Sequence, residues 1–320
     1  DQADIVLWMI DAADASLQIA QLSEKILPRS EGKQLILVFN KADLLTDIPK
    51  EEGAVYVSAK EKTGIEELKN AVAKLTETDT MTMKLVGDLI KPDDMVVLVT
   101  PIDSAAPKGR LILPQQQAIR DVLEANACAV VVRETELSGV LGRIEKPALV
   151  ITDSQAFARV SKDTPEDIPL TSFSILMARY KGFLDAAVKG VKAIDDLKDG
   201  DKVLISEGCT HHRQCGDIGS VKLPNWLKEY TGKNLEIVLS SGHGFPEELS
   251  DFALCIHCGG CMLGSKELTY RMKCACDAGV PFTNYGIAIA YMKGILKRSI
   301  GVLPHLVKEL EDHNGGQRTY

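Results

Sequence analysis

The chain has 320 residues, enough for two or three domains that each bury a core. Apolar residues make up 45% and charged residues 26%, which excludes a largely disordered protein. The formal net charge of −8 argues against broad binding to nucleic acid, whose phosphates require a surface rich in Lys and Arg. The sequence has no apolar run long enough to span a bilayer and no basic-then-apolar leader. We therefore expect a cytoplasmic protein that binds neither membrane nor nucleic acid.

Residues 1–78 alternate apolar strands with helices. The pattern predicts strands over 4–11, 34–39 and 54–57, a helix over 16–27 and another that starts at the Thr-Gly-Ile-Glu run. Such an alternation predicts a doubly wound α/β sheet, which binds ligands beyond the carboxyl ends of its strands. Two polar runs follow strands at that edge, namely Asn40, Lys41 and Asp43, and Ser58, Ala59 and Lys60.

These two runs, Asn-Lys-x-Asp and Ser-Ala-Lys, resemble the guanine-binding half of the P-loop GTPase family. The resemblance implies that Asp43 accepts hydrogen bonds from the ring N–H and the amine of guanine. It also implies that Asn40 and Lys41 brace the base and that the backbone of Ala59 meets the guanine oxygen. A fixed carboxylate pairs with two adjacent donors on guanine and mismatches adenine.

The phosphate-binding half of a GTPase is absent from the sequence, which has no Gly-x-x-x-x-Gly-Lys-[Ser/Thr] loop. We therefore expect the chain to lack the start of the natural protein. By itself it should bind GTP weakly and not hydrolyse it, whereas the intact protein should be a GTPase that uses GTP and Mg²⁺.

Residues 79–170 form a second α/β pattern, with strands predicted over 95–100, 127–132 and 147–152 and helices over 114–125 and up to 160. Cys128, in the run Ala-Cys-Ala-Val-Val-Val, is expected to be a small buried residue. A small sheet with long apolar strands needs its faces and edges covered. We therefore predict that this segment forms a homodimer.

Residues 171–320 open with a helix predicted over 174–197 and continue with strands over 202–206, 235–239, 252–256 and 281–285. Helices are predicted over 262–275 and 286–298. Three of the strands end at metal-ligating residues: Glu207 and Cys209-Thr-His211-His212, then Gly-His243-Gly, then His257-Cys258-Gly-Gly-Cys261. If the strands are parallel, all of these residues lie at one sheet edge.

Cysteine and histidine at this spacing favour zinc or an iron–sulfur cluster. The N–H groups of a helix that starts at residue 262 would stabilise the thiolates before it. A Cys₃His zinc site is one alternative that the sequence does not exclude. Another is a ferredoxin-like Cys-x-x-Cys-x-x-Cys run that includes Cys255, although its expected fourth Cys-Pro is missing and Cys255 fits a core position better. The nearby Cys215 also leaves the ligand set undecided.

The Cys-Thr-His-His and His-Cys-x-x-Cys runs, behind the two guanine-binding runs, resemble the HydF family of FeFe-hydrogenase maturation GTPases over all three segments. The resemblance implies that Cys209, Cys258 and Cys261 hold a 4Fe-4S cluster with an exchangeable fourth ligand. Candidates for that ligand or for the surrounding cavity are His211, His257, Asp217, Glu207 and His243. The implied role is a scaffold or carrier that receives a di-iron subcluster from radical-SAM maturases and delivers it to apo FeFe-hydrogenase.

Two other functions remain open from the residues. The first is a GTPase-linked interaction protein with a structural Cys/His zinc site. The second is a redox enzyme with a closed iron–sulfur cluster, in which every iron has a protein ligand.

Overall fold

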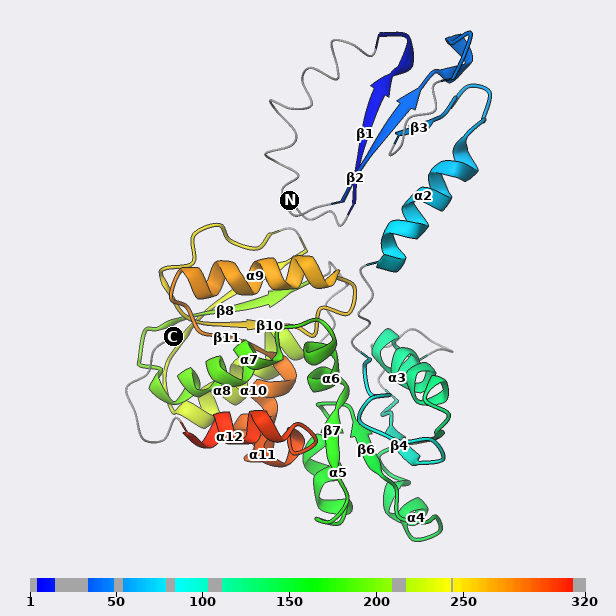
Figure 1. The fold of residues 1–320 in the computed structure, drawn as a ribbon. Helices are drawn as coiled ribbons and strands as arrows, with labels where there is room; N and C mark the ends of the chain where they lie inside the picture. Colours follow the sequence, from blue (N-terminus) through cyan, green and yellow to red (C-terminus); the bar gives the residue numbers. More distant parts are fainter. Residues whose placement is uncertain are drawn as a thin grey trace. The chain divides into compact units, whose positions relative to one another are not determined.

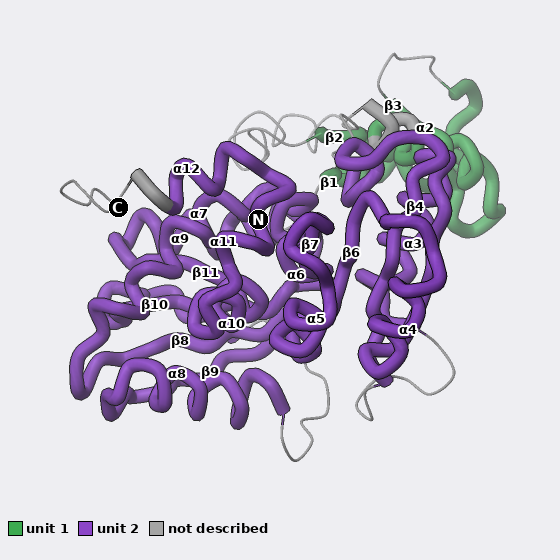
Figure 2. The backbone as a smooth tube through the Cα atoms, turned by 90° about the horizontal axis from the view of Figure 1, so that it is seen from below, with its two compact units in different colours: residues 1–83 green, residues 84–320 purple. Residues whose placement is uncertain are grey.

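The computed structural model describes residues 5–14, 34–48, 54–78, 84–102, 111–208, 217–242 and 244–312. The chain divides into two compact units, residues 1–83 and 84–320 (Figure 2). The predicted α/β class is confirmed, because the described strands form three sheets whose strand pairs are all parallel. Within these ranges, every helix is too short or too polar to cross a bilayer.

The first unit contains a three-stranded sheet in the order β1-β2-β3. Its strands are β1 (Ile5–Asp11), β2 (Gln34–Asn40) and β3 (Ala54–Tyr56), and α2 (Ile65–Thr78) packs against the sheet through its apolar face. Gly64 permits the tight turn before α2, because it has φ +73° and a Cβ there would lie 2.1 Å from the carbonyl oxygen of Tyr56. The helix predicted over 16–27 lies outside the described residues.

The second unit begins with a four-stranded sheet in the order β5-β4-β6-β7. In chain order its elements are β4 (Met95–Val99), α3 (Leu113–Glu124), β5 (Cys128–Val132), α4 (Leu137–Leu141), β6 (Leu149–Thr152), α5 (Phe157–Asp163) and β7 (Leu170–Ser172). Side chains of β4 alternate between two buried cores, one on each face, as expected for an inner parallel strand. Cys128 is exposed, so the expectation of burial was wrong; the residue starts the edge strand β5.

The chain then crosses to a second four-stranded sheet in the order β11-β10-β8-β9. The crossing segment contains α6 (Phe173–Tyr180), α7 (Leu184–Gly190) and the 3₁₀ helix η5 (Val191–Asp196). The sheet follows as β8 (Lys202–Glu207), η6 (Ile218–Lys222), α8 (Leu223–Thr231), β9 (Glu236–Ser241), β10 (Phe252–His257), α9 (Ser265–Asp277), β11 (Phe282–Asn284), α10 (Tyr285–Met292), α11 (Leu296–Ser299) and α12 (Pro304–Asp312). Helix α9 covers one face, and α7, α8 and α10 cover the other (Figure 1).

Both long helices predicted from sequence are broken. The helix predicted over 174–197 stops at Lys181 and Gly182, and the helix predicted over 286–298 stops at Lys293 and Gly294. Each glycine has a positive φ, +78° at Gly182 and +71° at Gly294. A glycine in the left-handed region ends a helix after its last turn, so each predicted helix becomes two α-helices, and the first range also ends in the 3₁₀ helix η5.

The two sheets of the second unit repeat one design. When the strands of each sheet are numbered in chain order, the second strand lies at one edge, and the first, third and fourth strands follow it across the sheet. The register also repeats, since Thr152 pairs with Val99 and Ser172, and His257 pairs with Ser206 and Asn284. We call residues 91–184 the first repeat and residues 198–296 the second repeat.

Local hydrogen bonds and sequence repeat as well. Before the first strand, the N–H of Lys91 donates to Asp94 at 2.8 Å, and the N–H of Lys198 donates to Asp201 at 2.7 Å. After the last strand, the side chain of Ser172 caps α6 and that of Asn284 caps α10. Identical residues recur between 169–184 and 281–296: Pro169 and Pro281, Thr171 and Thr283, Ile175 and Ile287, Ala178 and Ala290, Lys181 and Lys293, Gly182 and Gly294, and Leu184 and Leu296. These correspondences are those of an internal duplication.

The helix that follows each repeat packs on the other repeat. Helix α7, which follows the first repeat, packs on β11 of the second, where the Thr283 hydroxyl donates to the Ala187 carbonyl at 2.9 Å. Helix α11, which follows the second repeat, packs on β7 of the first. Equivalent residues meet between them, since a Cβ on Gly286 would lie 2.3 Å from the Cβ of Ser174. Contact between equivalent positions is the property of a two-fold axis, so the repeats pack as an internal pseudo-dimer.

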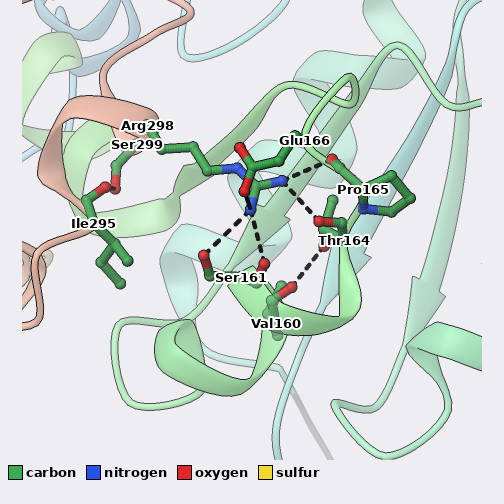
Figure 3. A network of polar contacts seen from close by, with 8 residues as sticks. All are labelled: Val160, Ser161, Thr164, Pro165, Glu166, Ile295, Arg298 and Ser299. Carbon is green, nitrogen blue, oxygen red and sulfur yellow. Dashed lines mark hydrogen bonds and ion pairs between the residues drawn. The ribbon is translucent and has the colours of Figure 1, made fainter.

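Arg298 of α11 secures this exchange (Figure 3). Its guanidinium donates to the carbonyl oxygens of Ser161, Thr164 and Pro165 at 2.7, 2.8 and 2.7 Å. It also contacts Glu166 at 3.2 Å. The Arg298 cation therefore satisfies carbonyl groups left open at the carboxyl end of α5.

Candidate functional site

The two polar runs of the first unit, Asn40-Lys41-x-Asp43 and Ser58-Ala59-Lys60, meet at the carboxyl edge of the first sheet. The side-chain oxygen of Asn40 accepts the backbone N–H of Ala59 at 3.1 Å. The hydroxyl of Ser58 donates to the carboxylate of Asp43 at 2.5 Å. Two hydrogen bonds therefore join the runs at this edge of the sheet.

Asp43 is exposed, and the hydrogen bond from Ser58 holds the pKa of its carboxyl below the usual range. The carboxylate is thus ionised at neutral pH and is an acceptor for a donor pair on a ligand. Lys60 is exposed and lies 3.4 Å from Glu61.

Lys41 adopts the left-handed conformation, with φ 65° and ψ 34°. Its ammonium lies 2.6 Å from the carboxylate of Asp11, at the end of β1. This contact raises the pKa of Lys41 and lowers the pKa of Asp11. Sequence reasoning missed Asp11, whose position at the end of the neighbouring parallel strand was the available signal.

The thiol-bearing edge is built by three parallel strands of the second repeat. The register pairs His257 with Ser206 on one side and with Asn284 on the other. The N–H of Cys258 then donates to the Ser206 carbonyl at 2.8 Å, which continues the ladder beyond β10. Glu207, His257 and Cys258 therefore lie together at the predicted edge.

Two backbone groups donate to the sulfur of Cys258. The N–H of Gly208 lies 3.1 Å from Sγ and the N–H of Gly260 lies 3.3 Å from it. Donors of this kind favour the thiolate over the thiol. Helix α9 begins only at Ser265, so the prediction that its N–H groups stabilise the thiolates was wrong. Instead, the backbone N–H groups of Gly208 and Gly260, which precede the helix, donate to the sulfur of Cys258.

Lys181 lies under the loop of residues 258–263, which we call the thiol loop. Its ammonium donates to the carbonyl oxygens of Gly260 and Leu263, each at 2.5 Å. The side chain is buried, and this burial lowers the pKa of Lys181, while the nearby sulfurs of Cys258 and Cys261 oppose the shift. A cation is therefore held beside both thiols.

His257 is wholly buried, and both of its ring nitrogens have partners. Nε2 lies 3.2 Å from a guanidinium nitrogen of Arg271, and Nδ1 lies 2.8 Å from the Cys258 carbonyl oxygen. Because arginine only donates, Nε2 accepts and Nδ1 carries the proton. Burial lowers the pKa of His257 to about 4, so the ring is neutral at pH 7.

Arg271 of α9 joins three parts of this edge. Besides His257, it donates to the Glu267 carboxylate at 2.7 Å and to the Gly242 carbonyl at 2.7 Å, and it lies over the ring of Phe245. One buried guanidinium thus fixes the imidazole and the carboxyl end of β9. Sequence reasoning missed Arg271 and Lys181 because each acts on a loop far away in the chain.

Two predicted carboxylates have different surroundings. Glu207 is buried and receives a hydrogen bond from the Tyr285 hydroxyl at 3.4 Å. Burial raises the pKa of Tyr285, which keeps it a donor. Asp217 accepts from the N–H and the hydroxyl of Ser220, each at 3.0 Å, at the start of η6.

Five cysteine and histidine positions named from the sequence lie outside the described residues, namely Cys209, His211, His212, Cys215 and His243. Among the side chains that the structure does describe, no three metal-ligating groups converge on one point. The described donor set still fits a thiolate-bound metal or cluster, because N–H donors and a buried ammonium offset negative charge at Cys258 and Cys261.

Two family models match the second unit. The Hydrogen maturase F dimerization domain matches residues 85–182, and the Hydrogen maturase F tetramerization domain matches residues 185–302. The chain belongs to the hydrogen maturase F family. This confirms the resemblance predicted from the sequence motifs. The predicted dimerisation of the middle segment agrees with the first model, whereas a tetramerisation domain was not predicted.

The N-terminal part of this hydrogen maturase F chain is similar to GTPases. The tRNA modification GTPase MnmE of Bacteroides thetaiotaomicron is 47% identical over 95 residues, which are 26% of this chain and 20% of that protein. The corresponding protein of Bacteroides fragilis is 48% identical over 87 residues, 27% of this chain and 19% of that protein. The chain therefore spans about a fifth of the length of these curated relatives.

Proposed function

We propose that this chain is part of a hydrogenase maturation protein that binds a 4Fe-4S cluster through Cys209, Cys258 and Cys261. The observation that supports it most is the 3.1 Å hydrogen bond from Gly208 to the sulfur of Cys258. Gly208 directly precedes Cys209, so this bond brings two segments fifty residues apart to one thiolate. Three thiolates on one cluster leave one iron open, which suits the transfer of a bound iron unit.

The fourth iron then needs an exchangeable ligand, and His257 is the weakest of the predicted candidates. Its Nε2 accepts from Arg271 and its Nδ1 donates to the Cys258 carbonyl, so ligation would break a buried hydrogen bond. Glu207, Asp217, His211, His243 and solvent remain. Glu207 lies at the same strand edge and accepts a hydrogen bond from the Tyr285 hydroxyl at 3.4 Å.

In this proposal the chain is a scaffold or carrier. It receives a di-iron subcluster from radical-SAM maturases and delivers it to apo FeFe-hydrogenase in the cytoplasm, as a homodimer formed through the first repeat. Residues 1–78 are the guanine-binding half of a GTPase domain, residues 79–170 the dimerisation domain and residues 171–320 the cluster domain. The intact protein binds GTP and Mg²⁺, and Asp43 recognises the guanine base by accepting its hydrogen bonds.

Anaerobic reconstitution with iron and sulfide tests the cluster site. We expect close to four irons and four sulfides per chain in the wild type, with a strong loss in Cys209→Ala, Cys258→Ala and Cys261→Ala. Cys276→Ala is the matched control, because Cys276 is exposed on α9. Stoichiometric zinc without acid-labile sulfide would contradict the proposal and favour a structural zinc site.

The fourth ligand is tested by pulsed EPR on the reduced cluster. Nitrogen coupling should be the same in the wild type and in His257→Ala, and added imidazole should introduce a new coupling. A histidine signal that disappears only in His257→Ala would show that the Arg271 hydrogen bond breaks on cluster binding.

Guanine recognition is tested by titration of a fluorescent guanine nucleotide. Asp43→Asn replaces one acceptor with an amide donor, so affinity should fall by about tenfold or more. Asp47→Asn, a nearby exposed carboxylate change, should have no effect. Equal binding by both variants would contradict a role of Asp43 in reading the base.

A further inference from the structure

We propose that Lys181 is a positioning residue that supplies the counter-charge of the thiol loop and raises the reduction potential of a cluster bound there. The inference rests on the proposed cluster site. It assigns to the first repeat a residue that completes a site in the second, because Lys181 lies within the dimerisation match and the thiol loop lies within the tetramerisation match.

The contacts of Lys181 define its position closely. Its ammonium donates to the carbonyl oxygens of Gly260 and Leu263, one on each side of Cys261. Gly260 has φ +58°, and its N–H donates to the sulfur of Cys258. Lys181 thus holds the carbonyl group of the same residue whose N–H donates to the sulfur of Cys258.

The burial of Lys181 needs an anion nearby. Only 6% of the residue is exposed, and no carboxylate among the described side chains pairs with it. A buried ammonium without a counter-ion is costly, and two neutral carbonyl groups offset only part of that cost. The sulfurs of Cys258 and Cys261 lie close enough to act on the ammonium, so the negative charge of a cluster held by these two residues would complete the pair.

The internal duplication supplies a comparison within one molecule. Lys293 is the equivalent of Lys181: each follows the last turn of a helix, with φ near −90°, and precedes a glycine of positive φ. Lys293 is exposed, however, and its ammonium lies 5.8 Å from the centre of the Trp226 ring. The same local structure therefore buries Lys181 against the thiol loop and leaves Lys293 at the surface.

A fixed cation beside a cluster favours the reduced state, because one-electron reduction adds a negative charge to the cluster. Removal of the Lys181 charge should therefore lower the potential. Arginine at this position keeps the charge, and methionine keeps most of the length of the side chain without it.

The test uses the full chain, reconstituted anaerobically, in four forms: wild type, Lys181→Met, Lys181→Arg and Lys293→Met. Reduction is followed by EPR in a redox titration, and circular dichroism checks folding. At a fixed potential, Lys181→Met should lower the ratio of reduced to oxidised cluster about tenfold, which is ~59 mV for a one-electron couple. The reduction potential of Lys181→Arg should stay near that of the wild type, and the potential of Lys293→Met should equal that of the wild type.

The results separate this inference from the proposed function. A wild type that assembles no cluster overturns both. A loaded Lys181→Met variant with the wild-type potential, or an equal shift in Lys293→Met, overturns the inference alone. If Lys181→Met folds without loading, loading of Lys181→Arg supports the counter-charge, and failure of both variants contradicts it.

Discussion

Arg271→Met should strongly destabilise the second unit. The Arg271 and Glu267 side chains are 2% and 9% exposed, and the change leaves the Glu267 carboxylate buried without its cation. Removing one partner of a buried ion pair costs about 3–5 kcal/mol. Hydrogen bonds to His257 and Gly242 are lost as well, at about 1 kcal/mol each, although methionine recovers part of the packing. We expect the free energy of unfolding to fall by about 4 kcal/mol.

The assay is urea unfolding followed by the fluorescence of Trp226. Trp8→Phe as a common background removes the tryptophan of the first unit. The double variant Glu267→Met and Arg271→Met should recover at least half of the loss, because neither charge of this buried pair remains.

Arg120→Met is the matched control. Arg120 forms a 2.6 Å ion pair with Glu124, also four residues away, but both side chains are more than half exposed. This change should cost less than about 0.5 kcal/mol. A loss below about 1 kcal/mol in Arg271→Met would refute the reasoning from burial.

Three further variants test other contacts of the second unit. Asp88→Asn should lower the free energy of unfolding by about 1 kcal/mol at pH 7, because the Arg179 guanidinium lowers the pKa of Asp88. The charge of Asp88 stabilises the folded protein above the pKa of about 3.9 that Asp has in the unfolded chain, and this stabilisation is lost as the pH falls through the lower pKa of Asp88 in the folded protein. The free energies of unfolding of wild type and variant, measured in urea, should therefore converge in acid. Gly190→Ala should lower the melting temperature clearly, since its Cβ would lie 2.2 Å from a backbone oxygen of β11, whereas Gly139→Ala, with open space around it, should not. Arg298→Lys should cost about 2 kcal/mol in urea unfolding, because an ammonium cannot reproduce the fork of hydrogen bonds to three carbonyl groups.

A result within error of the wild type would contradict each of these in turn. For the acid series, a difference between Asp88→Asn and wild type that persists below the folded pKa would show that the carboxylate acts through packing and not through its charge.

The strands could be predicted from sequence because their apolar runs bury both faces of parallel sheets. The run 95–100 predicted β4 to within one residue, and its side chains fill two cores. The helix breaks could not be predicted from periodicity. Leu176 and Leu184 lie on either side of the Lys181-Gly182 break, and both are buried, so the apolar pattern continues where the backbone turns.

The candidate site was predicted in part for a similar reason. Parallel order places Glu207, His257 and Cys258 at one edge whenever each follows or ends its own strand. The groups that act on the sulfur are different, since Gly208 and Gly260 contribute only backbone N–H groups. Lysine is also a residue that is almost always exposed, so nothing in the sequence marks Lys181 as buried.

Because of the exchanged helices, the dimerization match and the tetramerization match cannot be separated into two complete fragments at the border between them. A fragment that ends at residue 182 keeps Lys181 but loses α11, whose Arg298 caps α5. A fragment that starts at residue 185 keeps Cys258 and Cys261 but loses Lys181. Dissection at this border would therefore yield halves that each lack a part supplied by the other, and electrochemistry on residues 185–302 alone would, at the proposed cluster site, report a thiol loop without Lys181.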